Sequence, residues 1–200
     1  MSLKGFGLFT KIKNAGHDMT AIGLHGRSGD VVRLSNRLRI AKSFRGITLE
    51  GVTPRTTRGY DALMLAFLTH SALEVYLEIT GQKLGDLEKA HIARRSDTLL
   101  AEVFDVDDHN GHLFDFLYAR VNKSLQPKLA ACRDKKCFNV GIVSSAIRHI
   151  FAHGHLTANP NRMTPERVYR ICQKVSTFLV DFMDDDFNSR MREYAQGKRV

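Results

Sequence analysis

The feature that most constrains this chain is the spacing of apolar residues in two long segments. In residues 58–80 they recur at steps of three and four: Leu65, Leu68, Ala72, Val75 and Ile79. The same steps recur nearer the C-terminus: Val168, Ile171, Val175, Phe178 and Phe182. Such steps place side chains on one face of an α-helix. The pattern predicts two long amphipathic helices, the first of them central because further apolar residues widen its face.

Start and stop signals support both helices and predict others between them. Gly81 is a stop signal after the first segment, and Thr164-Pro165-Glu166 is a start signal for the second. Further helices are expected over 31–45, 84–104, 113–125 and 140–153. Pro127 is expected to end the helix over 113–125. Asn139 is expected to cap the helix over 140–153, which Gly154 follows. No strand-rich region appears after residue 30, so the expected fold is all-α, an antiparallel helical bundle.

The first 57 residues have a different character from the rest. Residues 1–29 carry six glycines, which disfavour a long helix. We therefore expect an irregular arm with a short strand near Ala21–Leu24, followed by the basic amphipathic helix over 31–45. The predicted division is a basic N-terminal arm over 1–57 and the bundle over 58–200.

Composition narrows the class of protein. With 43% hydrophobic and 26% charged residues the chain can bury a core. Its apolar run over 62–68 is far shorter than the roughly 18–20 residues of a membrane span, so no membrane partner is expected. The three cysteines, Cys132, Cys137 and Cys172, are an odd number without a CxxC motif. Reduced thiols and a cytoplasmic location are the expectation.

The charge is unevenly distributed. Of the formal net charge of +9, nearly all lies in residues 1–60, which hold eleven Lys/Arg and three Asp/Glu, against nineteen and eighteen in residues 61–200. A basic segment on a neutral domain suits a polyanion such as RNA; a merely solvated basic face stays open as the alternative. The candidate RNA-binding residues are Arg33, Arg37, Arg39, Lys42, Arg45 and His155.

The segment 146–156, AIRHIFAHGHL, holds the residues best suited to catalysis. Arg148 can bind phosphate oxygens with its forked guanidinium, while His149 and His153 can exchange protons near neutral pH. Phosphodiester cleavage needs both functions. On an ideal helix Arg148 and His153 diverge by about 140°, because residues advance by about 100° each. The two would converge if the helix turned at Gly154 or if a second copy faced the first.

At these residues the chain resembles the HEPN domain family. Arg148 to His153 is similar to the R-φ-x-x-x-H motif of that family, with His149 at the φ position, and Gly154 matches its common AHG ending. The position of the motif before a loop and a final amphipathic helix also resembles the family, as does the long helix containing SALEVYL (71–77). The resemblance covers about residues 58–183. Residues 1–57 have no counterpart in it.

The resemblance implies a helical bundle that dimerises and brings two motifs into one cleft. It also implies a metal-independent endoribonuclease without a cofactor, in which the RNA 2′-hydroxyl attacks the adjacent phosphate. His153 would be the acid/base, Arg148 would steady the phosphate, and His149 would orient groups or contact RNA. Family members act in toxin–antitoxin and other defence systems, which would make an antitoxin protein a partner. Other members only bind RNA, nucleotides or proteins, and this non-catalytic module is the alternative.

Several structural interpretations of the same residues stay open. Arg148 and His153 could simply stabilise a helix C-terminus, and His149, His153 and His155 could ligate a metal as H-x3-H-x-H. Two acidic clusters are interpreted as a solvated loop over 105–111 and an acidic helix end over 181–186. Glu74 is expected on the surface or paired with a basic neighbour.

Overall fold

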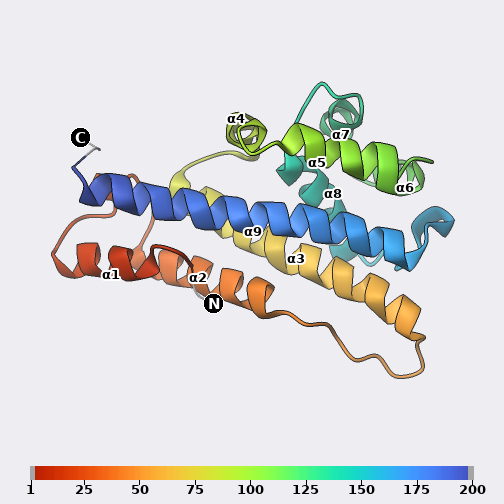
Figure 1. The fold of residues 1–200 in the computed structure, drawn as a ribbon, viewed down its shortest axis with the longest axis horizontal. Helices are drawn as coiled ribbons and strands as arrows, with labels where there is room; N and C mark the ends of the chain where they lie inside the picture. The colour runs from red at the N-terminus through yellow and green to blue at the C-terminus, as the bar shows by residue number, and fades with distance from the viewer. Residues whose placement is uncertain (1–2, 198–200) are drawn as a thin grey trace.

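The computed structural model describes residues 3–197, and within this range every regular element is a helix (Figure 1). The predicted all-α class is therefore confirmed. Two long helices, α3 (Pro54–Thr80) and α9 (Pro165–Ala195), run along the long axis. Helices α1 and α2 lie on one side of this pair, and the shorter α4 to α7 lie on the other (Figure 1).

Helices α3 and α9 are parallel neighbours. Three contacts join residues that lie 110 or 111 positions apart: Arg55 with Glu166, Arg58 with Tyr169, and Tyr76 with Asp186. Because this offset is nearly constant over about six turns of helix, the two helices run in the same direction. The apolar stripes of both segments face the core, as their spacing predicted. Most of their residues are buried, and Leu65, Leu68 and Phe178 are half-buried.

The helices on either side of α3 are antiparallel to it. For α2 (Ser28–Ser43) and the segments flanking it, partner numbers fall along α3: His25 with Ile79, Arg37 with Ser71, Ile47 with Asp61. For α8 (Val140–Ala152) they also fall: Gly141 beside Leu73, Ser144 with His70, Phe151 beside Phe67. The expected antiparallel arrangement thus holds for these neighbours and is wrong for the central pair. The return through α8 is what lets α9 run alongside α3 in the same direction.

The N-terminal segment is more regular than expected. It forms helix α1 (Phe6–Asn14) and a 3-10 turn η1 (Thr20–Ile22) where a strand was predicted. Most of its glycines lie at element ends with positive φ, including Gly5 before α1 and Gly23 after η1, so their number does not prevent a helix. Apolar side chains of the segment enter the common core: Leu3, Phe9, Ile12, Ile22 and Leu24. Residues 3–24 are therefore packed rather than irregular, while the division at residue 57 stays a prediction.

The middle of the chain is more broken than expected. The helix predicted over 84–104 is a 3-10 turn (η2, Leu84–Leu87), α4 (Glu88–Ile92) and α5 (Ser96–Ala101), followed by a π-helical turn (η3, Glu102–Asp107). Arg95 interrupts it with a left-handed φ of 62°. The next predicted helix ends early, at the end of α6 (His112–Tyr118). Pro127 lies in the first turn of α7 (Gln126–Arg133), so it begins a helix instead of ending one. A short turn, η4 (Pro160–Arg162), precedes α9.

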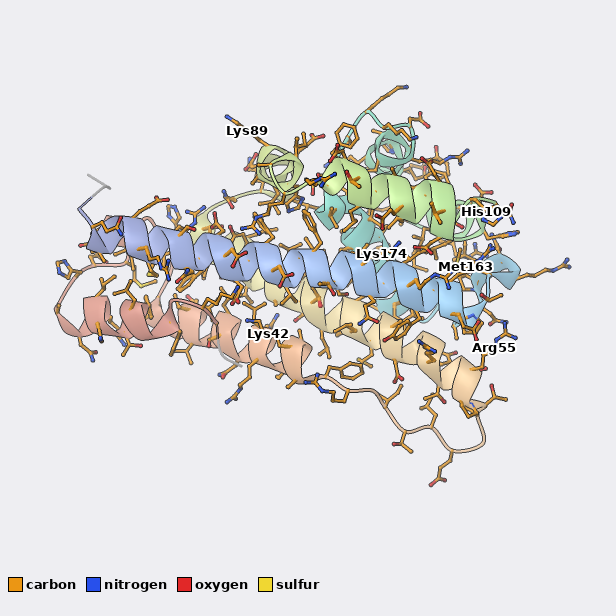
Figure 2. All side chains as sticks on the ribbon, in the orientation of Figure 1. Lys42, Arg55, Lys89, His109, Met163 and Lys174 are labelled. Atoms are coloured by element: carbon orange, nitrogen blue, oxygen red, sulfur yellow. The ribbon has the colours of Figure 1, made fainter. Side chains whose placement is uncertain are left out.

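The two acidic clusters are structural. Asp107 is buried and accepts bonds from Arg170 and Lys174 of α9, and buried Asp108 accepts the N–H groups of α6's first turn, so the solvated-loop interpretation of 105–111 is wrong for these two. The aspartates over 181–186 lie within α9, not at its end. Buried Asp184 pairs with Lys42 of α2 at 2.8 Å. Figure 2 labels Lys42 on α2.

Helix α3 is the most apolar long helix of the described residues. By length and composition alone it could cross a membrane. However, 56% of its most apolar window is buried, and α2, α8 and α9 all pack against it. The same length and composition are found in the core helix of a globular fold, which is the position that α3 occupies here.

Close packing at Gly59 predicts a specific loss of stability. A Cβ added to Gly59 would lie 2.6 Å from the Cβ of Ala158 and 3.1 Å from its Cα, in the loop that follows α8. We expect Gly59→Ala to lower the free energy of unfolding by about 1–3 kcal/mol, because the loop must move away from α3. Gly7→Ala is the control, since Gly7 lies in α1 with open space around it. Urea unfolding that ranks both variants equally would contradict the packing.

The buried ring of His91 predicts that stability falls in acid. It lies edge-on to Phe178 and Phe182, its nitrogens have no hydrogen-bond partner within residues 3–197, and burial lowers its pKa to about 4. The unfolded chain binds this proton near pH 6.5, so the stabilisation present above pH 6.5 is lost as the pH falls towards 4. From pH 7 to 5 the loss is about 2 kcal/mol from this ring. Urea unfolding at pH 7 and pH 5 should show this loss of unfolding free energy in the parent and in the control His109→Leu. The loss should be smaller in His91→Leu.

Candidate functional site at the end of helix α8

Helix α8 forms as its sequence predicts and ends where the motif lies. The side chain of Asn139 accepts the N–H of Gly141 at 3.0 Å and caps the first turn. Gly154 takes a left-handed φ of 72°, and the N–H of His155 bonds to the carbonyl of Ile150 at 3.1 Å. The helix ends at Ala152, and His153 is its cap residue. The motif is thereby held on a rigid helix end beside an exposed turn.

His149 and His153 lie against each other on this helix end. Their ring centroids are 4.6 Å apart in an edge-to-face arrangement, with His149 half-buried and His153 exposed. Burial lowers the pKa of His149, and the positive charges of His153 and Arg148 lower it further. His149 is therefore neutral at pH 7 and can accept a proton. The pKa of His149 therefore responds to the charge of both other members of the motif.

Arg148 projects from the other side of α8 towards α3. Its Nη2 is 3.1 Å from Oε1 of Glu74, and the side chains are 36% and 44% exposed. The expected pairing of Glu74 with a basic neighbour is confirmed. Because α8 stays helical up to His153, one chain does not turn Arg148 and His153 onto a common side.

Two residues that the sequence analysis did not select lie beneath this ion pair. The buried His70 of α3 bonds through Nδ1 to Oγ of Ser144 on α8, at 3.0 Å, and its Nε2 is 4.0 Å from Oε1 of Glu74. Burial, and then the charge of Arg148, lower the pKa of His70 to about 4. The signal was present in the spacing: His70 and Glu74 are four apart, as are Ser144 and Arg148, so each pair shares a helix face.

The basic residues predicted to bind RNA divide into two groups. Arg37 donates to the carbonyl and hydroxyl of Ser71 on α3, and Lys42 pairs with buried Asp184 on α9, so both join helices inside the fold. Arg33, Arg39 and Arg45 are exposed. Arg33 pairs with Asp30 on its own helix. Arg39 donates to the side-chain oxygen of Asn36, and Arg45 donates to the carbonyls of Lys42 and Phe44, so these contacts are with neutral oxygens.

His155 is exposed and does not complete a metal-binding group. Within residues 3–197 no three His, Cys, Asp or Glu side chains are arranged to hold a metal ion. The H-x3-H-x-H spacing therefore brings His149 and His153 together but does not assemble a three-residue ligand set. The cysteines Cys132, Cys137 and Cys172 are unpaired thiols.

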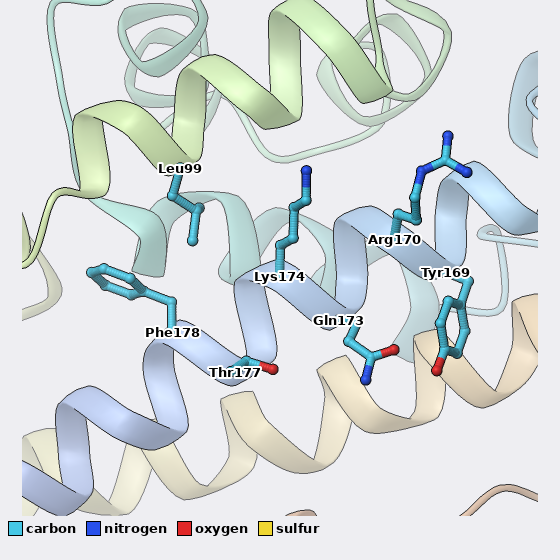
Figure 3. A pocket seen from close by; sticks show the side chains of 7 residues that line it. All are labelled: Leu99, Tyr169, Arg170, Gln173, Lys174, Thr177 and Phe178. Carbon is cyan, nitrogen blue, oxygen red and sulfur yellow. The ribbon is translucent and has the colours of Figure 1, made fainter.

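A separate apolar cavity of about 430 Å³ lies between α5 and α9. Figure 3 shows Leu99 and Phe178 at one end, with Lys174, Arg170 and Tyr169 along α9. Lys174 and Arg170 bond to Asp107. None of the residues of the α8 motif lines this cavity, so the cavity is separate from the motif.

Comparison with known proteins leaves the site to be interpreted from its own residues. No family model, curated protein or solved structure matches the chain significantly. The geometry itself offers one guanidinium and two imidazoles at an exposed helix end, with a carboxylate bound to the guanidinium.

The contact between the two motif histidines predicts coupled titration. In His153→Ala we expect the pKa of His149 to rise, because a positive charge that opposes its protonation is removed, without reaching the ordinary value, because burial remains. Histidine NMR titration measures this directly. His155→Ala, which removes an exposed imidazole two residues on, should leave the pKa of His149 unchanged. Equal shifts in both variants would contradict the observed arrangement.

Proposed function

We propose that this chain is a metal-independent endoribonuclease of the HEPN type that acts as a homodimer. The observation that carries the proposal is the grouping of Arg148, His149 and His153 at the exposed end of α8. The all-helical fold and the final long helix after a loop support it, since the resemblance implies both. A toxin or defence role with an antitoxin partner belongs to the same proposal.

The chemistry follows from the groups present. An imidazole takes the proton of the RNA 2′-hydroxyl, whose oxygen attacks the adjacent phosphorus. The bond to the 5′-oxygen breaks, that oxygen receives a proton, and the products carry a 2′,3′-cyclic phosphate and a 5′-hydroxyl. Arg148 stabilises the charge on the phosphate oxygens, with His153 as acid/base and neutral His149 beside it as the orienting group.

A second copy supplies what the helix geometry of one copy does not. Arg148 and His153 lie on different sides of α8, by about 140° on an ideal helix. Two α8 ends that face each other would bring the guanidinium of one copy to the imidazole of the other. His153, Gly154 and His155 are exposed, which leaves this end open for such a contact.

A second candidate function is a non-catalytic HEPN-like module that binds RNA, a nucleotide or a protein. The observation that favours it is the ion pair of Arg148 with Glu74, which neutralises the charge that a phosphate would need. The exposed Arg39 and Arg45 would then provide much of the attraction for a polyanion, and binding would weaken with salt.

An RNA cleavage assay in EDTA distinguishes the two. We expect the parent to cut single-stranded RNA and leave cyclic phosphate ends. Arg148→Ala and His153→Ala should lower the rate by about a hundredfold or more, the usual effect of removing a positioned proton-transfer or charge-stabilising group. His109→Ala, which removes an exposed histidine outside α8, is the control, and circular dichroism and sedimentation check the fold and the dimer. Salt-sensitive binding with no product would select the second candidate, and cleavage by both site variants at the parent rate would refute the first.

A further inference from the structure

Two facing pairs of residues connect α3 to α8 next to the motif. On α3, His70 and Glu74 are one turn apart; on α8, Ser144 and Arg148 are one turn apart. They join across the interface as two rungs, which are Ser144 with His70 at 3.0 Å and Arg148 with Glu74 at 3.1 Å. The first rung is buried and the second is exposed.

We propose that Glu74, supported by His70 and Ser144, is a positioning residue that orients the Arg148 guanidinium for the phosphate. This inference rests on the proposed function. It gives three residues outside the R-x4-H motif a role in positioning Arg148, and it makes α3 part of the site.

The buried rung defines the state of His70. Because the ring is held neutral at pH 7 by burial, only one of its nitrogens carries a proton. Nε2 faces the Glu74 carboxylate at 4.0 Å, which is too long for a hydrogen bond but close enough to favour a proton on Nε2. Nδ1 then accepts the hydroxyl proton of Ser144. The Nε2–H dipole in turn holds the Glu74 carboxylate on the side that meets Arg148.

The exposed rung explains why support is needed. An isolated surface ion pair contributes little and leaves a long arginine side chain mobile. Glu74 meets Arg148 at Nη2, 3.1 Å from Oε1. A guanidinium carries five N–H groups, more than one carboxylate can engage, so N–H groups stay available to a phosphate. Orientation before binding lowers the barrier of the chemical step, whereas the carboxylate itself weakens attraction for an anion. Loss of Glu74 should therefore slow turnover without weakening RNA binding.

The matched pair Glu74→Gln and Glu78→Gln tests the exposed rung. Both changes remove one carboxylate from exposed positions of α3, one turn apart, and alter net charge equally. We expect Glu74→Gln to lower kcat about tenfold or more with KM unchanged or lower, and Glu78→Gln to behave like the parent. A parent-like or raised kcat in Glu74→Gln overturns the positioning role.

NMR makes the test independent of activity. The Nε–H signal of Arg148, assigned with Arg148→Lys, should become mobile in Glu74→Gln but not in Glu78→Gln. Ser144→Ala should change the nitrogen shifts of the neutral His70 ring, and Ser145→Ala on the same helix should not. If the parent cuts no RNA, the proposed function fails, while the Arg148 signal still decides whether Glu74 holds the guanidinium. An Arg148 signal equally ordered in both glutamine variants overturns the inference.

Discussion

The structure depends on the parallel packing of α3 against α9. A constant offset of about 111 residues, seen from Arg55 with Glu166 to Tyr76 with Asp186, fixes the two helices along most of their length. Helices α2 and α8 pack against α3, and α1 packs against α9. Lys4, just before α1, and Lys42 of α2 bond to aspartates of α9, and α8 packs against α3. Two apolar stripes would pack equally well in several registers; the polar contacts at both ends select one of them.

This register explains how an open surface can present an ordered site. Because α8 is antiparallel to α3, residues one turn apart on each helix meet in pairs, and the ion pair of Arg148 stands directly above a buried contact of His70. The turn after α8 is fixed from two sides: Gly154 ends the helix in a left-handed conformation, and Gly59 lets Ala158 approach the backbone of α3. The half-buried His149 and the exposed His153 are thus placed by the regular end of α8 and the turn after it.

Helices with one apolar face were predicted well from the sequence. Helix boundaries that depend on tertiary contacts were predicted poorly. Periodicity and end signals found α2, α3, α8 and α9, and the segment over 58–80 was correctly expected to be central. The direction of α9 relative to α3 could not be predicted, because an apolar stripe specifies neither the partner helix nor whether the two helices pack parallel or antiparallel. The breaks over 84–125 depend on single residues such as Arg95 with its left-handed φ. At the site, the spacing of the α8 motif was visible in advance, whereas His70 and Ser144 become neighbours only through the packing of two helices 74 positions apart.

The uneven charge of the chain has a structural part that composition alone does not reveal. The basic N-terminal third packs against α9, whose aspartates bind Lys4 and Lys42, so some of the local positive excess is used to hold the fold together. A buried carboxylate such as Asp184 needs those partners, because an unpaired charge at that position would be costly. Other basic side chains of this third stay exposed, among them Arg39 on α2 and Arg45 just after it. Under the proposed function, attraction for RNA would come from α2 and its C-terminal end and the chemistry from α8, and α3 packs against both helices.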